Sequence, residues 1–221
     1  MKRLFRLLRA DEIECRVATC RKDGVSLLLY KNARCDMNIL DETVGPFNWQ
    51  REHKELKGNI YCGVSINKNY NNDLPAEWIT KWDAGAESYT EKEKGEASDS
   101  FKRACVNAGI GRELYTAPFI WIKAADTKLE EYDGKWKCKD SFLIRAIEYE
   151  NDIISYLLVC NKRGEIVYQF GVAEADRTPR KKLIAYCKSN GIDMNDVAAK
   201  YELGKDSTDD DYMRALEGLK K

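Results

Sequence analysis

The sequence has only one histidine, His53, and none of its eight cysteines stands in a C-x-x-C pair. A zinc site with the usual ligand spacing is therefore not expected, and neither is a Ser-His or Cys-His pair for nucleophilic catalysis. We expect a protein without catalytic residues, metal or cofactor, and hence not an enzyme. The scattered cysteines are interpreted as reduced thiols that pack as small apolar side chains.

Long apolar runs are also missing. No segment approaches the roughly 20 apolar residues that cross a bilayer, so no membrane partner is expected. The N-terminal MKRLFRLLRADE is basic and partly apolar, but Arg6 and Arg9 interrupt it and no small-residue cleavage site follows, which argues against a signal peptide. We predict a short amphipathic helix here that docks on the body of the protein or on a neighbouring subunit; contact with DNA is the alternative.

Net charge is absent as well, because 37 basic and 37 acidic side chains cancel. This total argues against a surface coated with positive charge, but it does not exclude a local basic patch. Residues 1–34 contain nine Lys or Arg and four Asp or Glu, a local excess of five positive charges. No G-x-x-x-x-G-K-[ST] loop is present, so a motor driven by nucleotide hydrolysis is not expected.

The hydrophobic pattern that is present predicts an α+β fold, with a mostly antiparallel, twisted sheet packed on a long helix. Gly45-Pro46 ends the first predicted helix, and Lys57-Gly58-Asn59 supplies a hairpin turn. Thr90 and Glu93 are spaced as a capping box for the long helix. The expected order is β-β-α-β-β-β-α, with strands at 13–20, 25–30, 47–56, 60–67 and 77–82 and helices at 33–43 and from about 90 to 108.

Beyond this core, residues 141–170 predict three more strands, after an acidic and polar connection. Three short helices are expected at the C-terminus, the second of them capped by Asp193. The stretch RTPRKK (177–182) reads as a solvated linker or as a second DNA contact. We expect three parts: an annealing and single-strand-binding core at 1–123, a β extension at 124–171, and a linker with a small helical module at 172–221.

The most informative stretch is FKRACVNAGIGRELY (101–115). Phe101 lies at the centre of a predicted apolar helix stripe, with Arg103 on the opposite face and Lys102 near the edge. Two interpretations follow from the residues alone. The two cations stabilise the negative end of the helix dipole, or they form a ridge that grips phosphates, with Arg112 beyond the glycine turn and Tyr115 able to stack on a base.

GEASDSFKRACVNAGIGRELY (95–115) resembles the signature helix and turn of the Rad52 superfamily of single-strand annealing proteins, which includes the phage Sak and Erf types. YKNARCDMNILDETVGPFNW (30–49) is similar to an earlier family segment, in which a basic residue opens a helix that is followed by a glycine and an aromatic-rich strand. The resemblance covers roughly residues 8–123. Val106 stands where relatives carry a third basic residue, and Pro46 stands where some carry an aromatic one.

The resemblance implies an ATP-independent protein of phage or prophage origin, working in the cytoplasm of a bacterial host. Such proteins form rings or helical arrays, hold single-stranded DNA in a basic groove between subunits, and promote annealing in recombination and repair. A phage exonuclease or a single-strand-binding protein is a possible partner. The implied DNA-binding residues are Lys102, Arg103 and Arg34, with Lys31 or Arg112 compensating for Val106 and Tyr115 as the stacking aromatic.

Two other functions remain open at this point. A passive module would coat single strands without pairing them, and would bind DNA without accelerating annealing. A nuclease would need carboxylates that converge on a metal ion. The acidic residues fall mostly in predicted turns and on exposed faces, which argues against a metal-dependent nuclease.

Overall fold

The computed structural model describes residues 3–86, 92–174 and 178–220, without the side chains of residues 92–94. The chain divides into two compact units, Met1–Phe170 and Gly171–Lys221. Each is described by itself below. No helix in these described ranges is both long enough and apolar enough to cross a membrane.

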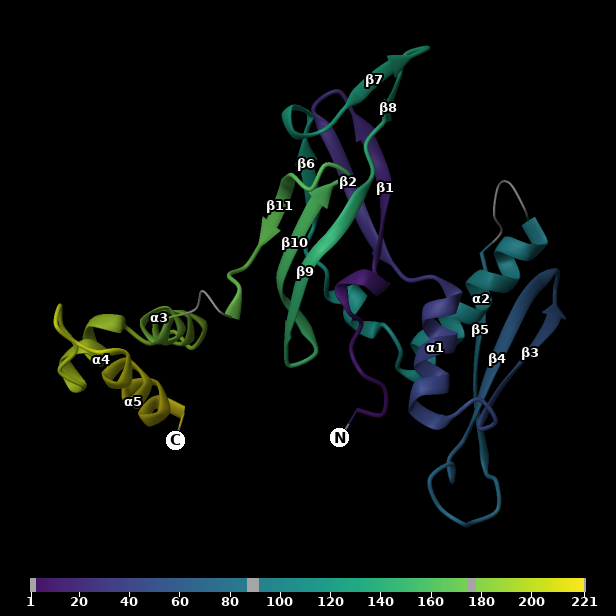
Figure 1. Ribbon diagram of the computed structural model, residues 1–221, viewed down its shortest axis with the longest axis horizontal. Coiled ribbons are helices and arrows are strands. Elements are labelled where there is room, and N and C mark those ends of the chain that lie inside the picture. Colours follow the sequence, from purple (N-terminus) through teal and green to yellow (C-terminus); the bar gives the residue numbers. More distant parts are fainter. Residues whose placement is uncertain (1–2, 87–91, 175–177, 221) are drawn as a thin grey trace. The chain divides into compact units, whose positions relative to one another are not determined.

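The first unit contains a six-stranded sheet of order β11-β10-β9-β1-β2-β6 (Figure 1). Its recorded pairings are all antiparallel, and β1 joins the N-terminal hairpin to β9 through the pair Glu14 and Leu143. The late strands predicted at 141–170 therefore extend the same sheet as the N-terminal hairpin. The strands are β1 (Glu14–Arg21), β2 (Gly24–Tyr30), β6 (Ile120–Lys123), β9 (Phe142–Glu150), β10 (Ile153–Asn161) and β11 (Ile166–Phe170).

A second sheet, of order β3-β4-β5, packs against the long helix α2 (Lys92–Ala108). Its strands are β3 (Trp49–Leu56), β4 (Asn59–Asn67) and β5 (Trp78–Ala84), and the helix α1 (Ala33–Val44) precedes them. The predicted α+β fold and the element order of the core are thus confirmed. The structure adds that the strands form separate sheets. The predicted capping box, Thr90 and Glu93, lies outside the described residues and side chains.

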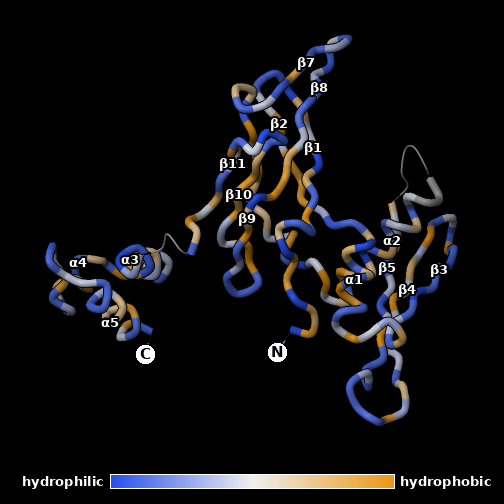
Figure 2. The backbone as a smooth tube through the Cα atoms, in the orientation of Figure 1, coloured by the Kyte–Doolittle hydropathy of each residue, from blue (hydrophilic) through white to orange (hydrophobic). Residues whose placement is uncertain are grey.

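Residues 124–140, expected to be a polar connection, instead contain a β-hairpin of β7 (Leu129–Tyr132) and β8 (Lys135–Cys138), after a short 3-10 turn η3 (Ala124–Asp126). Its turn is Asp133-Gly134, with positive φ at both positions, the backbone of a tight two-residue hairpin loop. The expectation was wrong because strands of four residues give too short an alternation to recognise. Figure 2 shows this hairpin as largely hydrophilic, whereas β10 is mainly apolar.

The predicted N-terminal amphipathic helix is also wrong. Residues 3–9 are not helical, and only Ala10–Glu12 forms a short 3-10 turn (η1). Phe5 and Leu8 are buried in the core of the first unit. The Leu8 amide donates to Glu113 Oε1 at 2.7 Å, and the Leu8 carbonyl accepts from the Tyr149 hydroxyl at 2.9 Å. This backbone therefore bonds to distant side chains instead of to its own helical turns.

The core of the first unit joins residues from both sheets and from α1 and α2. All eight cysteines of the chain are free thiols, and five of them are buried. Burial raises the pKa of Cys62 to about 11 and that of Cys35 to about 12. The interpretation of these cysteines as small apolar side chains agrees with their positions.

The second unit consists of the helices α3 (Pro179–Ser189), α4 (Met194–Lys200) and α5 (Asp209–Lys220). Its own small core includes Leu183, Val197 and Leu216. Asp193 caps α4 as predicted, since its side chain accepts from the Asn195 amide at 2.8 Å. Part of the expected linker is helical, because Thr178 caps α3 and residues 179–182 form its first turn; residues 175–177 lie outside the described ranges.

Candidate nucleic-acid interface

Helix α2 is held by its apolar stripe. Phe101, Ala104 and Cys105 are fully buried, and the Phe101 ring stacks on Trp49 of β3 at a centroid distance of 6.1 Å. Side chains next to the stripe must then lie at the edge of the helix or face solvent, because helical positions turn by about 100° per residue. Lys102 lies at this edge and is 27% exposed, whereas Arg103 is 49% exposed.

Gly109, the first of the two glycines in GIG (109–111), is needed to end α2. Gly109 has φ of 115° and its amide donates to Val106 O at 3.0 Å, while the Ile110 amide donates to Cys105 O at 2.9 Å. These two bonds make a Schellman C-cap, in which glycine adopts the left-handed conformation without steric cost. Arg112 completes the cap, since its guanidinium donates to Val106 O at 2.8 Å and to Asn107 O at 2.6 Å.

The helix-capping interpretation therefore applies to Arg112, and not to Lys102 or Arg103. The last turn of α2 contains no basic residue. Lys102 Nζ instead lies 3.4 Å from Asp99 Oδ1, and an Arg103 guanidinium nitrogen lies 3.3 Å from Asp83 Oδ1. Such partly exposed pairs typically contribute less than about 1 kcal/mol, so a phosphate group can compete for either cation.

Lys31 has a different environment from the other candidates. It is 4% exposed, its ammonium is paired with the fully buried Asp36, and it also donates to the backbone carbonyl of Lys102 at 3.3 Å. Burial raises the pKa of Asp36 to about 6, an effect that the charges of Lys31 and Lys102 oppose. The charge of Lys31 is thus neutralised inside the protein by Asp36. The hydrogen bond from Lys31 to the Lys102 carbonyl fixes the turn of α2 that carries Lys102.

Gly111 makes this burial possible. Its φ is 77°, and a Cβ at this position would collide with the aliphatic part of Lys31. The second glycine of GIG therefore lets the chain after α2 pass directly over the buried lysine. Only glycine satisfies both the left-handed backbone and the close approach.

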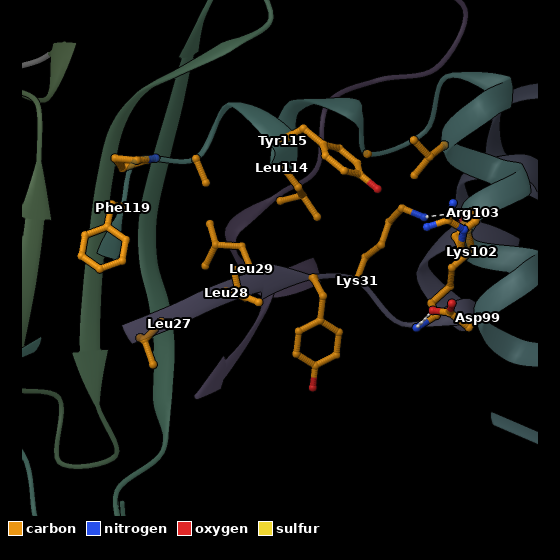
Figure 3. A pocket seen from close by; sticks show the side chains of 15 residues that line it. Leu27, Leu28, Leu29, Lys31, Asp99, Lys102, Arg103, Leu114, Tyr115 and Phe119 are labelled. Carbon is orange, nitrogen blue, oxygen red and sulfur yellow. Dashed lines mark hydrogen bonds and ion pairs between the residues drawn. The ribbon is translucent and has the colours of Figure 1, made fainter. Parts of the chain in front are cut away.

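Four of the six predicted residues come together around one cavity of about 620 Å³ between β2, α2 and the 3-10 turn η2 (Arg112–Thr116) (Figure 3). We call Lys31, which lines this cavity, and its buried partner Asp36, which does not, the floor, and we call Lys102, Arg103 and Tyr115 the rim. Tyr115 is 72% exposed, and its hydroxyl points toward α2 in Figure 3. The remaining lining is mainly apolar and aromatic, including Leu28, Tyr30 and Phe119.

Arg34 lies outside this cavity, in a second hollow of about 450 Å³ whose lining also includes Arg51, His53 and Ser98. Among the described residues, no acidic side chain lines the second hollow and none forms an ion pair with Arg34. Ser98 and Lys102 are one helical turn apart on α2, so the two hollows are neighbours along that helix.

Arg51 is the candidate that the sequence analysis missed. Its guanidinium carbon lies 4.8 Å from the centre of the Phe101 ring, and its side chain lines the hollow of Arg34. Alternation along β3 could have placed Arg51 on the same face as Trp49, but nothing in the local sequence connects β3 with α1. His53 lines the same hollow, and its Nε2 lies 3.1 Å from Ala97 O of α2.

The family comparison agrees with this geometry. Residues 14–133 match the model of the Rad52/22 family of double-strand break repair proteins. The chain belongs to this family. No curated protein matches the chain significantly.

The matched Rad52/22 region contains all six predicted DNA-binding residues and Arg51. It also contains the whole β3-β4-β5 sheet and the residues of α2 that line the two hollows. Membership implies a role in DNA double-strand break repair, and with it DNA binding. The match ends inside the turn of hairpin β7–β8, so β9 to β11 and the helical unit lie beyond it. Within the described ranges, no three His, Cys, Asp or Glu side chains converge as metal ligands.

Proposed function

We propose that this member of the Rad52/22 family is an ATP-independent single-strand annealing protein of the phage recombination type. The observation that carries the proposal is the rim: the partly exposed Lys102 and the exposed Arg103, each with one acidic partner among the described residues, beside the exposed Tyr115. Phosphates bound there leave the base edges free to find a complement, because backbone contacts carry no sequence information.

In this proposal the sugar–phosphate backbone runs along α2, from Arg34 and Arg51 in the second hollow to Lys102 and Arg103 on the rim. Tyr115 stacks on a base. Lys31 and Arg112 support the site indirectly, the first by holding the Lys102 turn and the second by capping α2. Oligomers, as rings or helical filaments, would bring such sites into one continuous groove.

The proposal assigns residues 1–123 to the DNA-binding core, 124–171 to its β extension and 172–221 to a linker and helical module. It also assigns the protein to the cytoplasm of a bacterial host. A phage exonuclease or a single-strand-binding protein is the expected partner there.

The experiment is the annealing of two complementary oligonucleotides, labelled with a fluorophore and a quencher, without ATP or metal ions. The parent protein is expected to accelerate annealing clearly above the spontaneous rate, and Lys102→Ala combined with Arg103→Ala to abolish the acceleration. Lys57→Ala combined with Lys205→Ala removes the same charge from exposed positions elsewhere and serves as the control. Binding without acceleration would identify a coating protein, and a double variant as active as the parent would refute the assignment of the rim.

A further inference from the structure

Hairpin β7–β8 places its lysine side chains on one face. Directly paired residues of antiparallel strands share a face, and alternate residues point to opposite faces. Tyr132 pairs with Lys135 and Glu130 pairs with Lys137, and the Lys139 amide donates to Lys128 O at 2.9 Å. One face therefore carries four lysines, one glutamate and one tyrosine, an excess of three positive charges (four minus one). We call it the lysine face: Lys128, Glu130, Tyr132, Lys135, Lys137 and Lys139.

The opposite face anchors the hairpin. It carries Leu129, Glu131, Trp136 and Cys138, of which Leu129 and Cys138 pack against the core of the first unit. The Cys138 thiol also lies near the Thr127 hydroxyl and donates to Asp140 O at 3.5 Å. With one face held by the protein body, the lysine face is left toward solvent, and all four lysines are exposed.

Little within the hairpin neutralises these lysines. Among the residues that the structure describes, only Lys139 of these four lysines has an ion-pair partner, Glu130 at 3.0 Å, and both side chains are more than half exposed. Lys137 lies 5.3 Å above the centre of the Tyr132 ring, which is itself 71% exposed. Lys135 and Lys137 form no ion pair with any residue in the described ranges. Lys135, Lys137 and Lys139 stand at every second position, about 7 Å apart along the strand direction, and form a regular row of positive charge.

We infer that the lysine face is a second nucleic-acid contact, which binds the phosphate backbone independently of the cavity beside α2. Nucleic acid is the expected ligand because of charge complementarity: a row of exposed lysines beside an exposed aromatic residue suits a polyanion that also offers bases for stacking. A two-stranded ribbon is narrow enough for a major groove about 12 Å wide, so duplex DNA fits as well as a single strand. The hairpin shares no lining residue with either hollow near α2. A protein could thus hold one strand at the rim and a second strand, or the annealed product, at the hairpin.

The test measures affinity for a short duplex and for one of its strands by fluorescence anisotropy over a series of salt concentrations. In Lys135→Gln/Lys137→Gln/Lys139→Gln, we expect affinity to fall about tenfold or more near about 0.1 M salt. The slope of log affinity against log salt should become shallower by roughly 2.7 for the duplex, or by roughly 2.1 for the single strand. The duplex and single-strand measurements show which form the hairpin holds.

Two controls keep the result specific. Lys57→Gln/Lys188→Gln/Lys205→Gln removes the same charge from other exposed positions and should change neither affinity nor slope. Replacing the three hairpin lysines with arginine should restore binding. The loss should also persist in the Lys102→Ala/Arg103→Ala background, which separates this inference from the proposed rim. Equal slopes for the hairpin and control variants would overturn the inference. So would poly-glutamate competing as well as DNA at equal charge, which would point to an acidic protein partner.

Discussion

The floor and the rim of the cavity beside α2 carry the same kinds of charge but differ in burial. On the floor, Lys31 and Asp36 are sealed from solvent, and Lys31 also bonds to the backbone of α2. On the rim, Lys102 and Arg103 are each paired with a partly exposed carboxylate, Asp99 and Asp83. A buried charge can leave its partner only at a large cost in free energy, whereas an exposed one exchanges partners easily. Burial therefore separates the cation that builds the site from the cations that are free to bind a ligand.

The largest expected effect comes from breaking the floor. Asp36→Ala leaves the Lys31 ammonium buried without its counter-charge, and should lower the free energy of unfolding by about 3 to 5 kcal/mol at neutral pH. Chemical denaturation followed by circular dichroism measures the change. Asp99→Ala removes the acidic partner of Lys102 on the rim and should change stability by about 0.5 kcal/mol or less. Equal losses in the two variants would remove the distinction between floor and rim.

The floor should also respond to pH. Burial raises the pKa of Asp36 to about 6, so between pH 4 and this value the folded protein binds the proton that the unfolded chain has released. The contribution of Asp36 to the unfolding free energy should therefore fall as pH rises from about 4 to about 6, by at most about 3 kcal/mol, and stay level above. The side-chain carboxyl signal in a ¹³C NMR titration gives the midpoint. A midpoint near 4 would contradict the prediction.

Substitutions on the rim should have the opposite effect to Asp36→Ala, with little loss of stability and a clear loss of single-strand binding. Lys102→Ala with Arg103→Ala should weaken single-strand binding roughly 20-fold near about 0.1 M salt, and should make the salt slope shallower by roughly 1.4, for two phosphate contacts. Fluorescence anisotropy supplies both quantities. The unfolding free energy should change by about 1 kcal/mol or less, because both cations are partly exposed. A loss of stability comparable to that of Asp36→Ala would show that the rim is structural.

The aromatic part of the rim gives a smaller effect. Tyr115→Leu keeps an apolar side chain but removes the ring, and should weaken single-strand binding about tenfold if one base stacks there. The salt slope should not change, because no phosphate contact is lost. Phe47→Leu is the matched control, since Phe47 is 92% exposed and lines neither hollow. A shallower slope in Tyr115→Leu would mean that the substitution disturbs the neighbouring cations.

The smallest effect on binding is expected from Arg112, whose guanidinium bonds to the carbonyls at the end of α2. Arg112→Ala should lower the unfolding free energy by about 1 kcal/mol through the lost cap. It should leave the salt slope for single-stranded DNA unchanged. A slope reduced by roughly 0.7 would instead make Arg112 a direct phosphate contact.

The local sequence determined the elements of this protein. The order β-β-α-β-β-β-α, the apolar stripe of α2 around Phe101 and the glycine turn that ends it all follow from short-range periodicity and backbone preference, which depend on neighbours a few residues away. The edge positions of Lys102 and Arg103 follow from the same periodicity. The strands of hairpin β7–β8 were missed because four residues give too little alternation to detect.

Only the tertiary structure decided which cations are buried. Lys31 lies on the floor because Asp36 and Gly111, far apart in the sequence, close around it. Arg51 joins Arg34 because β3 packs beside α1 and α2. The N-terminal stretch is not helical because its backbone bonds to Glu113 and Tyr149. Each outcome depends on desolvation and on hydrogen bonds between distant segments, and these energies exist only once the chain has brought the segments together.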